Sequence, residues 1–182
     1  MMSPNSWILG RFMLLCALLA ACCSVRAQDS TLAEIKYKED YDRLQSIIRA
    51  SDPAKRANQM LAFYKERPDT DARLLTYADN VFDKDLETLM NQENTSVLRD
   101  LCARALKLRP KFGEVYLFQG VVLKSEHKID EAMLCFAKCY MIKNPLQSKA
   151  KQQLDIAYRA GNQGSLIGED KILKRAVQEL EK

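Results

Sequence analysis

Beyond the N-terminal segment, three cysteines and one histidine are the residues best suited to metal or redox chemistry. Cys135 and Cys139 lie four residues apart in "DEAMLCFAKC", and His127, the only histidine, comes eight residues before Cys135. Side chains four residues apart share one face of a helix, so zinc could use both thiolates. A structural zinc site normally needs four ligands, and the sequence places neither Cys102 nor a carboxylate as the fourth. We therefore expect buried core thiols, with a disulfide from Cys102 or a metal site as alternatives.

Other chemical motifs are incomplete. His127 falls in a predicted turn, and no nucleophile with an orienting carboxylate can be assigned around it. The glycines of residues 160–171, "AGNQGSLIGEDK", lack the Gly-Lys-Ser/Thr ending of a phosphate loop and are better explained as a helix stop and connector. Asn94 begins an "NTS" triplet that matches a glycosylation acceptor in a predicted turn. We expect no catalytic residue, no metal site and no cofactor.

The carboxylates of residues 79–87, "DNVFDKDLE", allow two interpretations. A solvated helix face is the common explanation for such a run. Alternatively, they could form a catalytic pair, but no companion motif accompanies them.

Residues 1–27 have the pattern of a secretory signal. They contain no acidic side chain, and an apolar stretch of 12 residues, Phe12 to Cys23, follows Arg11. A spanning helix needs about 20 apolar residues, so a helical membrane anchor is the weaker interpretation. "LAAC", ending at Cys22, resembles the lipobox of bacterial lipoproteins. Cleavage after Ala27 gives a soluble periplasmic or secreted protein, whereas lipidation at Cys22 gives a tethered one.

Removing residues 1–27 leaves 26 basic and 24 acidic side chains, a net charge of +2. Basic and acidic side chains in nearly equal numbers are typical of a solvated surface rather than of one that binds phosphates. We therefore expect no nucleic-acid partner. The three remaining cysteines are an odd number, which excludes a closed disulfide framework.

The rest of the sequence predicts an all-α protein. Residues 28–35 are expected to be a flexible N-terminus and residues 36–182 a helical domain. "FYKERP", "ALKLRP" and "YMIKNP" each end an apolar run of helical period with basic residues and a proline stop, at spacings of 42 and 35 residues. Asp52 is a predicted N-cap before Pro53. We expect stacked antiparallel helix hairpins, about four pairs, with residues 147–182 as a capping pair.

Residues 113–145 resemble a tetratricopeptide repeat. The agreement lies in large residues flanking a glycine on the first helix, then in an alanine, an aromatic, a small residue and a proline at the family's spacing. These positions are Tyr116, Gly120, Leu123, Ala132, Phe136, Cys139 and Pro145. Residues 95–110 match in part, and residues 37–68 match only in outline, with Arg56 in the alanine's place.

The resemblance implies a non-catalytic module that holds a protein or peptide of unknown identity on its helical surface, in the cell envelope. The groove-facing positions of the clear repeat would be Leu117, Val121, Lys124 and Ser125, although one or both of Leu117 and Val121 could instead pack against a neighbouring helix. Because first helices face the concave side in this family, Asp83 and Glu87 would also line the groove and contact a partner. The alternative is an envelope assembly or structural component that acts through oligomerisation or a lipid anchor at Cys22.

Overall fold

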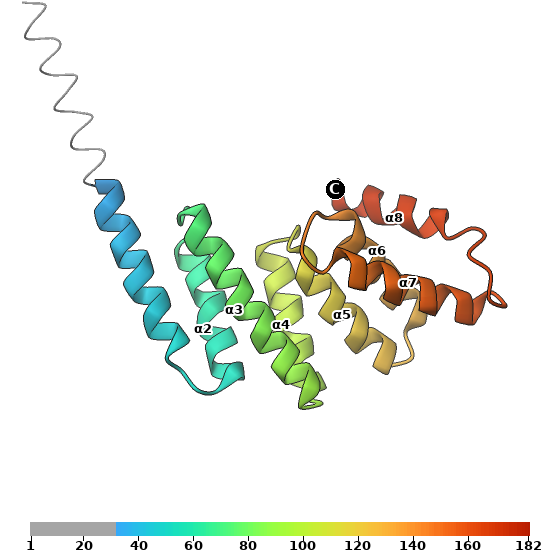
Figure 1. Ribbon diagram of the computed structural model, residues 1–182, viewed down its shortest axis with the longest axis horizontal. Helices are drawn as coiled ribbons and strands as arrows, with labels where there is room; N and C mark the ends of the chain where they lie inside the picture. Colours follow the sequence, from blue (N-terminus) through green and yellow to red (C-terminus); the bar gives the residue numbers. More distant parts are fainter. Residues whose placement is uncertain (1–31) are drawn as a thin grey trace, which may run out of the picture. The chain divides into compact units, whose positions relative to one another are not determined.

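The computed structural model describes residues 32–182, and these residues form eight helices and no strand (Figure 1). The first helix covers residues 32–48, so it begins four residues before the expected boundary at residue 36. The others are α2 (Pro53–Glu66), α3 (Ala72–Asn91), α4 (Thr95–Leu108), α5 (Gly113–Ser125), α6 (Ile129–Met141), α7 (Gln147–Gly161) and α8 (Asp170–Leu180). The all-α prediction is therefore confirmed.

The chain divides into two units after Arg43, and residues 44–182 are described here as one of them. The predicted signal segment, its cleavage site and Cys22 lie outside the described residues. Over residues 32–182, no helix combines the length and the apolar character that crossing a membrane requires.

Local hydrogen bonds cap the starts of α2 and α3 and the end of α5. Asp52 accepts a hydrogen bond of 2.9 Å from the backbone N–H of Ala54, as its predicted N-cap role requires. Asp71 does the same for Arg73 at the start of α3. At the end of α5, His127 has a φ of 61°, and the N–H groups of His127 and Lys128 bond back to Lys124 and Leu123. This hydrogen-bond pair is a Schellman motif, which usually places glycine at the left-handed position.

From α2 to α7, helices that follow one another along the chain pack together, and so do several alternate ones. α2 contacts α4, α3 contacts α5, and α5 contacts α7. The final helix differs from the expected pattern because α8 packs on α6 rather than returning along α7 as a hairpin. An ion pair of 2.8 Å between Lys138 and Glu179 links α6 to α8.

The interior contains two apolar clusters that share α5. Val115, Phe118 and Val122 belong to a cluster built with α2, α3 and α4. Tyr116 and Leu117 belong to a second cluster built with α6, α7 and α8. α5 is therefore buried on opposite faces, which explains why its sequence is apolar around most of its circumference.

Five of the seven predicted repeat-core residues are buried, namely Tyr116, Gly120, Ala132, Phe136 and Cys139. A Cβ added to Gly120 would lie 2.6 Å from Phe136 Cδ1, so the missing side chain is what allows α5 and α6 to approach. Leu123 is half-buried against the second cluster. Pro145 is exposed, so its assignment to the core was wrong, and it lies in the connection between α6 and α7.

Candidate functional site

The four residues that the resemblance placed on the binding face of α5 differ in depth. Leu117 is only 1% exposed, so its prediction as a partner contact was wrong. It packs against neighbouring helices instead, as the alternative interpretation expected. Val121 is half-buried against the second cluster. Ser125 is exposed but turns its hydroxyl back to the carbonyl of Val122, 2.7 Å away. Lys124 is half-buried, and its Nζ lies 3.4 Å from Gln153 Oε1 on α7.

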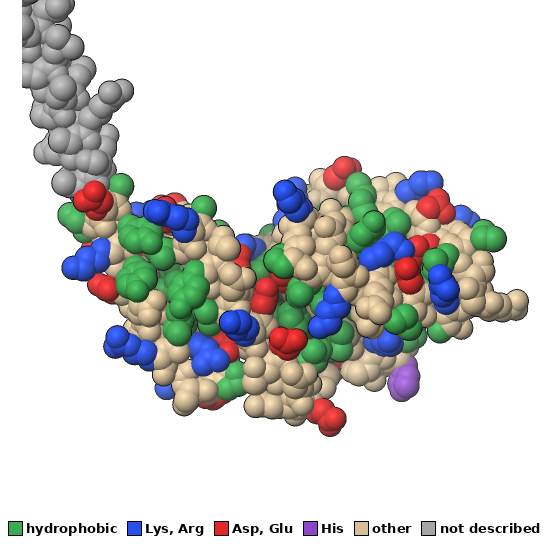
Figure 2. Space-filling view, viewed as in Figure 1, with side chains coloured by type: hydrophobic (Ala, Val, Ile, Leu, Met, Phe, Trp, Pro, Cys, Tyr) green, Lys and Arg blue, Asp and Glu red, His purple; other side chains and the backbone are tan. Residues whose placement is uncertain are grey.

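Lys124 also lines an open hollow of about 590 Å³ formed by α5, α6 and α7. Ile129 and Ile156 lie in its wall and are 38% and 48% exposed, and Met133 and Ala157 are buried beneath them. We call this feature the α5–α7 hollow. Exposed branched side chains around a concavity can bury their apolar surface against another molecule, which isolated surface isoleucines cannot do as effectively. Elsewhere, basic and acidic side chains are interspersed over the visible face (Figure 2).

The predicted acidic residues of α3 have unequal environments. Glu87 is about half exposed, and its carboxylate lies 3.9 Å from Lys149 Nζ on α7. Asp83 is half-buried, and its Oδ1 is out of contact with solvent and has no hydrogen-bond partner in the described part of the chain. Burial, and then the charge of Glu114 on α5, raise the pKa of Asp83 to about 8. Only Glu87 of this pair presents an open carboxylate on the α3 surface.

The three cysteines of the described residues are free thiols. Cys102 and Cys139 are buried and Cys135 is half-buried. Burial raises the pKa of Cys139 to about 12 and that of Cys135 to about 11, which disfavours the nucleophilic thiolate. Within residues 32–182, no three His, Cys, Asp or Glu side chains are grouped so as to hold a metal ion. His127 is exposed in the turn predicted for it.

Sequence reasoning missed a stacked arginine at the end of α4. Arg109 donates to both carboxylate oxygens of Asp79, at 2.5 and 2.9 Å. Its guanidinium carbon lies 4.2 Å from the ring centre of Phe112 and 5.1 Å from that of Tyr64. The two acceptor oxygens and the flanking rings fix the guanidinium plane. No local signal could have found this pair, because Asp79 and Arg109 are 30 residues apart.

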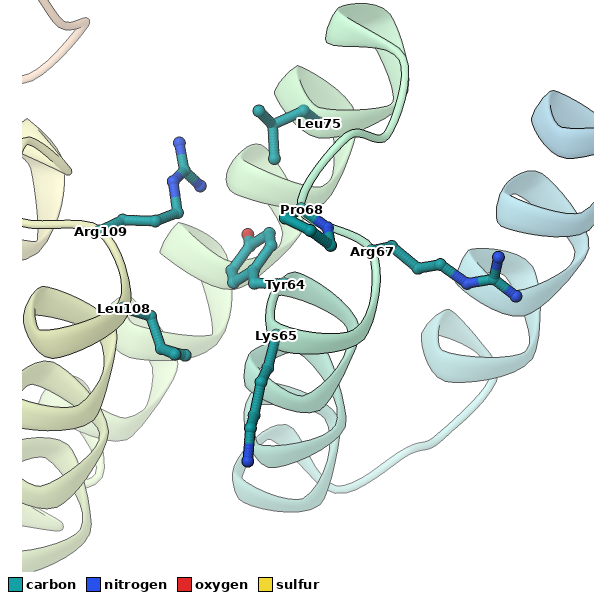
Figure 3. Close-up of a pocket in the computed structure, with 7 residues that line it drawn as sticks. All are labelled: Tyr64, Lys65, Arg67, Pro68, Leu75, Leu108 and Arg109. Carbon is teal, nitrogen blue, oxygen red and sulfur yellow. The ribbon is translucent and has the colours of Figure 1, made fainter. Parts of the chain in front are cut away.

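Arg109 and Tyr64 line a second hollow, of about 340 Å³, together with Lys65, Leu75 and Leu108 (Figure 3). The Tyr64 side chain is 6% exposed, and its hydroxyl has no hydrogen bond of ordinary geometry among the described residues. Burial, and then the negative charge of Asp79, raise the pKa of this hydroxyl well above its usual value. Tyr64 therefore stays a neutral wall of the hollow.

Sequence reasoning also missed an ion pair between Arg56 and Asp85. This pair explains why position 56 holds arginine where the repeat pattern has alanine. Its guanidinium binds both oxygens of the fully buried Asp85 on α3 and also donates to the carbonyl of Ala50. Burial raises the pKa of Asp85, and the hydrogen bond from Arg56 opposes this shift. The sequence held one signal for this pair, an arginine at a position where the repeat pattern has alanine. An arginine that is largely buried needs a carboxylate partner, so this substitution could have indicated an ion pair.

No protein-family model, curated protein or solved structure matches this chain.

Proposed function

We propose that this protein is a non-catalytic scaffold that binds a segment of another protein in the α5–α7 hollow. The observation that carries the proposal is the hollow itself, with Ile129 and Ile156 exposed around an apolar base and Lys124 at its edge. Covering such side chains contributes about 25 cal/mol for each Å² of apolar surface removed from water, and the entropic cost of association opposes this gain. Lys124 and Asp130 give the rim a charge of each sign, which would orient an incoming segment.

The same proposal includes a tetratricopeptide-like stack. Its support is the close approach of Gly120 and Phe136 between α5 and α6, together with the neighbouring alternate helices α3, α5 and α7. Stacks of this kind present extended surfaces because each hairpin contacts mainly its neighbours.

Site-specific crosslinking in the producing cell tests the scaffold proposal. A photoreactive residue at Ile156 should give one dominant adduct, and the same residue at exposed Lys171 on α8 is the matched control. Adding Lys124→Glu should reduce the Ile156 adduct by several-fold while circular dichroism stays unchanged. Equal adduct yields at positions 156 and 171, or an adduct insensitive to Lys124, would contradict binding in this hollow.

We further propose that the protein acts in the cell envelope, on the basis of the signal pattern in residues 1–27. The mass of the mature N-terminus tests this and separates the two forms of export. A chain that begins at Gln28 without lipid supports a soluble form, and a lipidated Cys22 supports a tethered one. Recovery of the intact leader on the cytoplasmic protein would refute export.

A further inference from the structure

A second surface of residues 44–182 combines basic side chains with apolar ones. The hollow that contains Tyr64 and Arg109 adjoins another of about 490 Å³, and both include Lys65 and Leu108 in their walls. Together they form one groove along α2 and α4, which we call the α2–α4 groove. None of the residues that line it is acidic, whereas five are lysine or arginine. In a chain of nearly balanced charge, this segregation is a local electrostatic feature.

The basic side chains differ in how far they are neutralised. Arg109 is paired with Asp79, and Arg104 with Asp100 at 2.9 Å. Arg104 also donates to Asn58 on α2, a bond of 2.7 Å that links the two helices. Lys65 and Lys107 are exposed, and no ion pair is recorded for either in the described part of the chain. These two ammonium groups are therefore the charges most available to an anionic partner.

The base of the groove is apolar. Leu61 is buried, Ala62 and Leu75 are half-buried, and Leu108 is 40% exposed between the two hollows. In the close-up, the Tyr64 ring lies between Leu75 and Leu108 (Figure 3). A partner that offered only negative charge would leave Leu108 in water. The groove instead suits a partner with both carboxylates and apolar side chains.

We propose that the α2–α4 groove binds an acidic amphipathic segment of another protein, whose apolar side chains cover Leu108 and whose carboxylates pair with Lys65 and Lys107. The apolar base favours a protein segment over nucleic acid, because phosphate contacts alone would leave Leu108 exposed to water. This surface is separate from the α5–α7 hollow, since the two share no lining residue. The molecule would then hold two segments at once and act as an adaptor.

Fluorescence anisotropy with synthetic peptides tests the proposal on the purified chain. The probe is a labelled helical peptide with leucines along one face and glutamates along the other. Two control peptides replace either the glutamates by lysines or the leucines by alanines. We expect the probe to bind at least about tenfold more tightly than either control, with affinity falling as salt is added.

The double variant Lys65→Glu/Lys107→Glu should weaken probe binding by about tenfold or more, since both replaced charges are unpaired and exposed. Lys143→Glu/Lys171→Glu replaces two exposed lysines outside the groove that also lack an ion pair in the described part of the chain, so it is the matched control and should bind like the original chain. Leu108→Ala should weaken binding several-fold without changing its salt dependence. Circular dichroism of each variant verifies the fold.

Three outcomes would overturn the proposal. Equal binding of the alanine-containing acidic peptide would show that charge alone is recognised. An equal loss of probe affinity in the two double lysine variants would show that binding depends on the net charge of the protein and not on the groove. Tighter binding to phosphatidylglycerol vesicles or to duplex DNA than to the probe, lost on the Lys65/Lys107 substitution, would assign the groove to a phosphate-bearing partner instead. None of these results bears on crosslinking at Ile156, so the two proposals fail independently.

Discussion

At the scale of single residues, the contact between Gly120 and Phe136 is the most sharply defined. We expect Gly120→Ala to lower the free energy of unfolding by about 1–3 kcal/mol, because the new methyl group would meet the Phe136 ring at 2.6 Å in a packed interior. Phe136→Ala should cost about 3–5 kcal/mol by leaving a cavity. Urea denaturation followed by circular dichroism measures both changes.

Gly161→Ala is the matched control, because a Cβ there meets nothing within 4 Å and the residue ends a helix. It should be neutral or slightly stabilising. The combination Gly120→Ala/Phe136→Leu should cost less than the sum of its single changes, since a smaller side chain makes room for the methyl group. Strict additivity would show that the two residues do not share one space.

The sequence predicted single residues correctly where an interaction joins near neighbours in the chain or where the spacing of residues follows a known pattern. The Asp52 cap needs only a carboxylate two residues before an N–H group, and the contact of Gly120 with Phe136 agrees with the spacing of the repeat that residues 113–145 resemble. It failed for Leu117 because α5 is apolar on two faces. When apolar residues lie on two faces of a helix, their spacing alone does not show which face is exposed to solvent.

At the scale of helices, the end of α5 carries a conformational cost. His127 occupies a left-handed position at φ 61° that glycine adopts freely. We expect His127→Gly to raise the free energy of unfolding by about 0.5–1 kcal/mol, and His127→Ala to leave it nearly unchanged. Urea titrations of the two variants side by side make the measurement. A larger loss in His127→Ala would reveal a side-chain interaction beyond the turn.

The stripe of α3 that faces α5 makes stability depend on pH. The pKa of Asp83 is about 8 in the folded chain and about 4 when unfolded, so between these values the folded state binds more protons. The stabilisation is complete below pH 4 and is lost as the pH rises through 8. Glu114, Asp79 and Glu87 favour the protonated form, whereas Arg109 opposes it.

Asp83→Asn should therefore flatten the decline in unfolding free energy between pH 5 and pH 8. At pH 9 the variant should be more stable than the original chain by about 1 kcal/mol or more. Glu87→Gln removes only the weakest of the charges that favour protonation of Asp83, so this exposed comparison variant should change the slope much less than Asp83→Asn does. An unchanged slope in Asp83→Asn would mean that this carboxyl is ionised in the folded chain at neutral pH.

The helices were largely predictable because prolines, glycines and capping residues act within a few positions of where they occur. The packing of α8 on α6 was not predictable from the sequence. Its apolar stripe specifies that one face must be covered, but any apolar surface could serve, and α6 provides it together with the Lys138–Glu179 ion pair. The Asp79–Arg109 and Arg56–Asp85 pairs were hidden for a related reason, since a charge run in sequence does not reveal which helix lies across from it.

At the scale of the whole molecule, α5 joins the two apolar clusters of residues 44–182. Cys102 lies in the first cluster and Cys139 in the second, and both are 0% exposed. In repeat stacks, neighbouring units unfold together when the interface between them is strong. Because α5 contributes side chains to both clusters, loss of either one exposes part of this helix to water.

We therefore expect a single unfolding transition in which both thiols become reactive together. Two variants that retain only Cys102 or only Cys139 can be pulse-labelled with an alkylating reagent along a urea gradient. The labelling midpoints should coincide with each other and with the loss of helical circular dichroism. Labelling in the absence of urea should be slow for both, since burial raises the pKa of each thiol. If Cys139 became reactive at a clearly lower urea concentration than Cys102, the second cluster would be an independent unit, and α5 would belong energetically to the first.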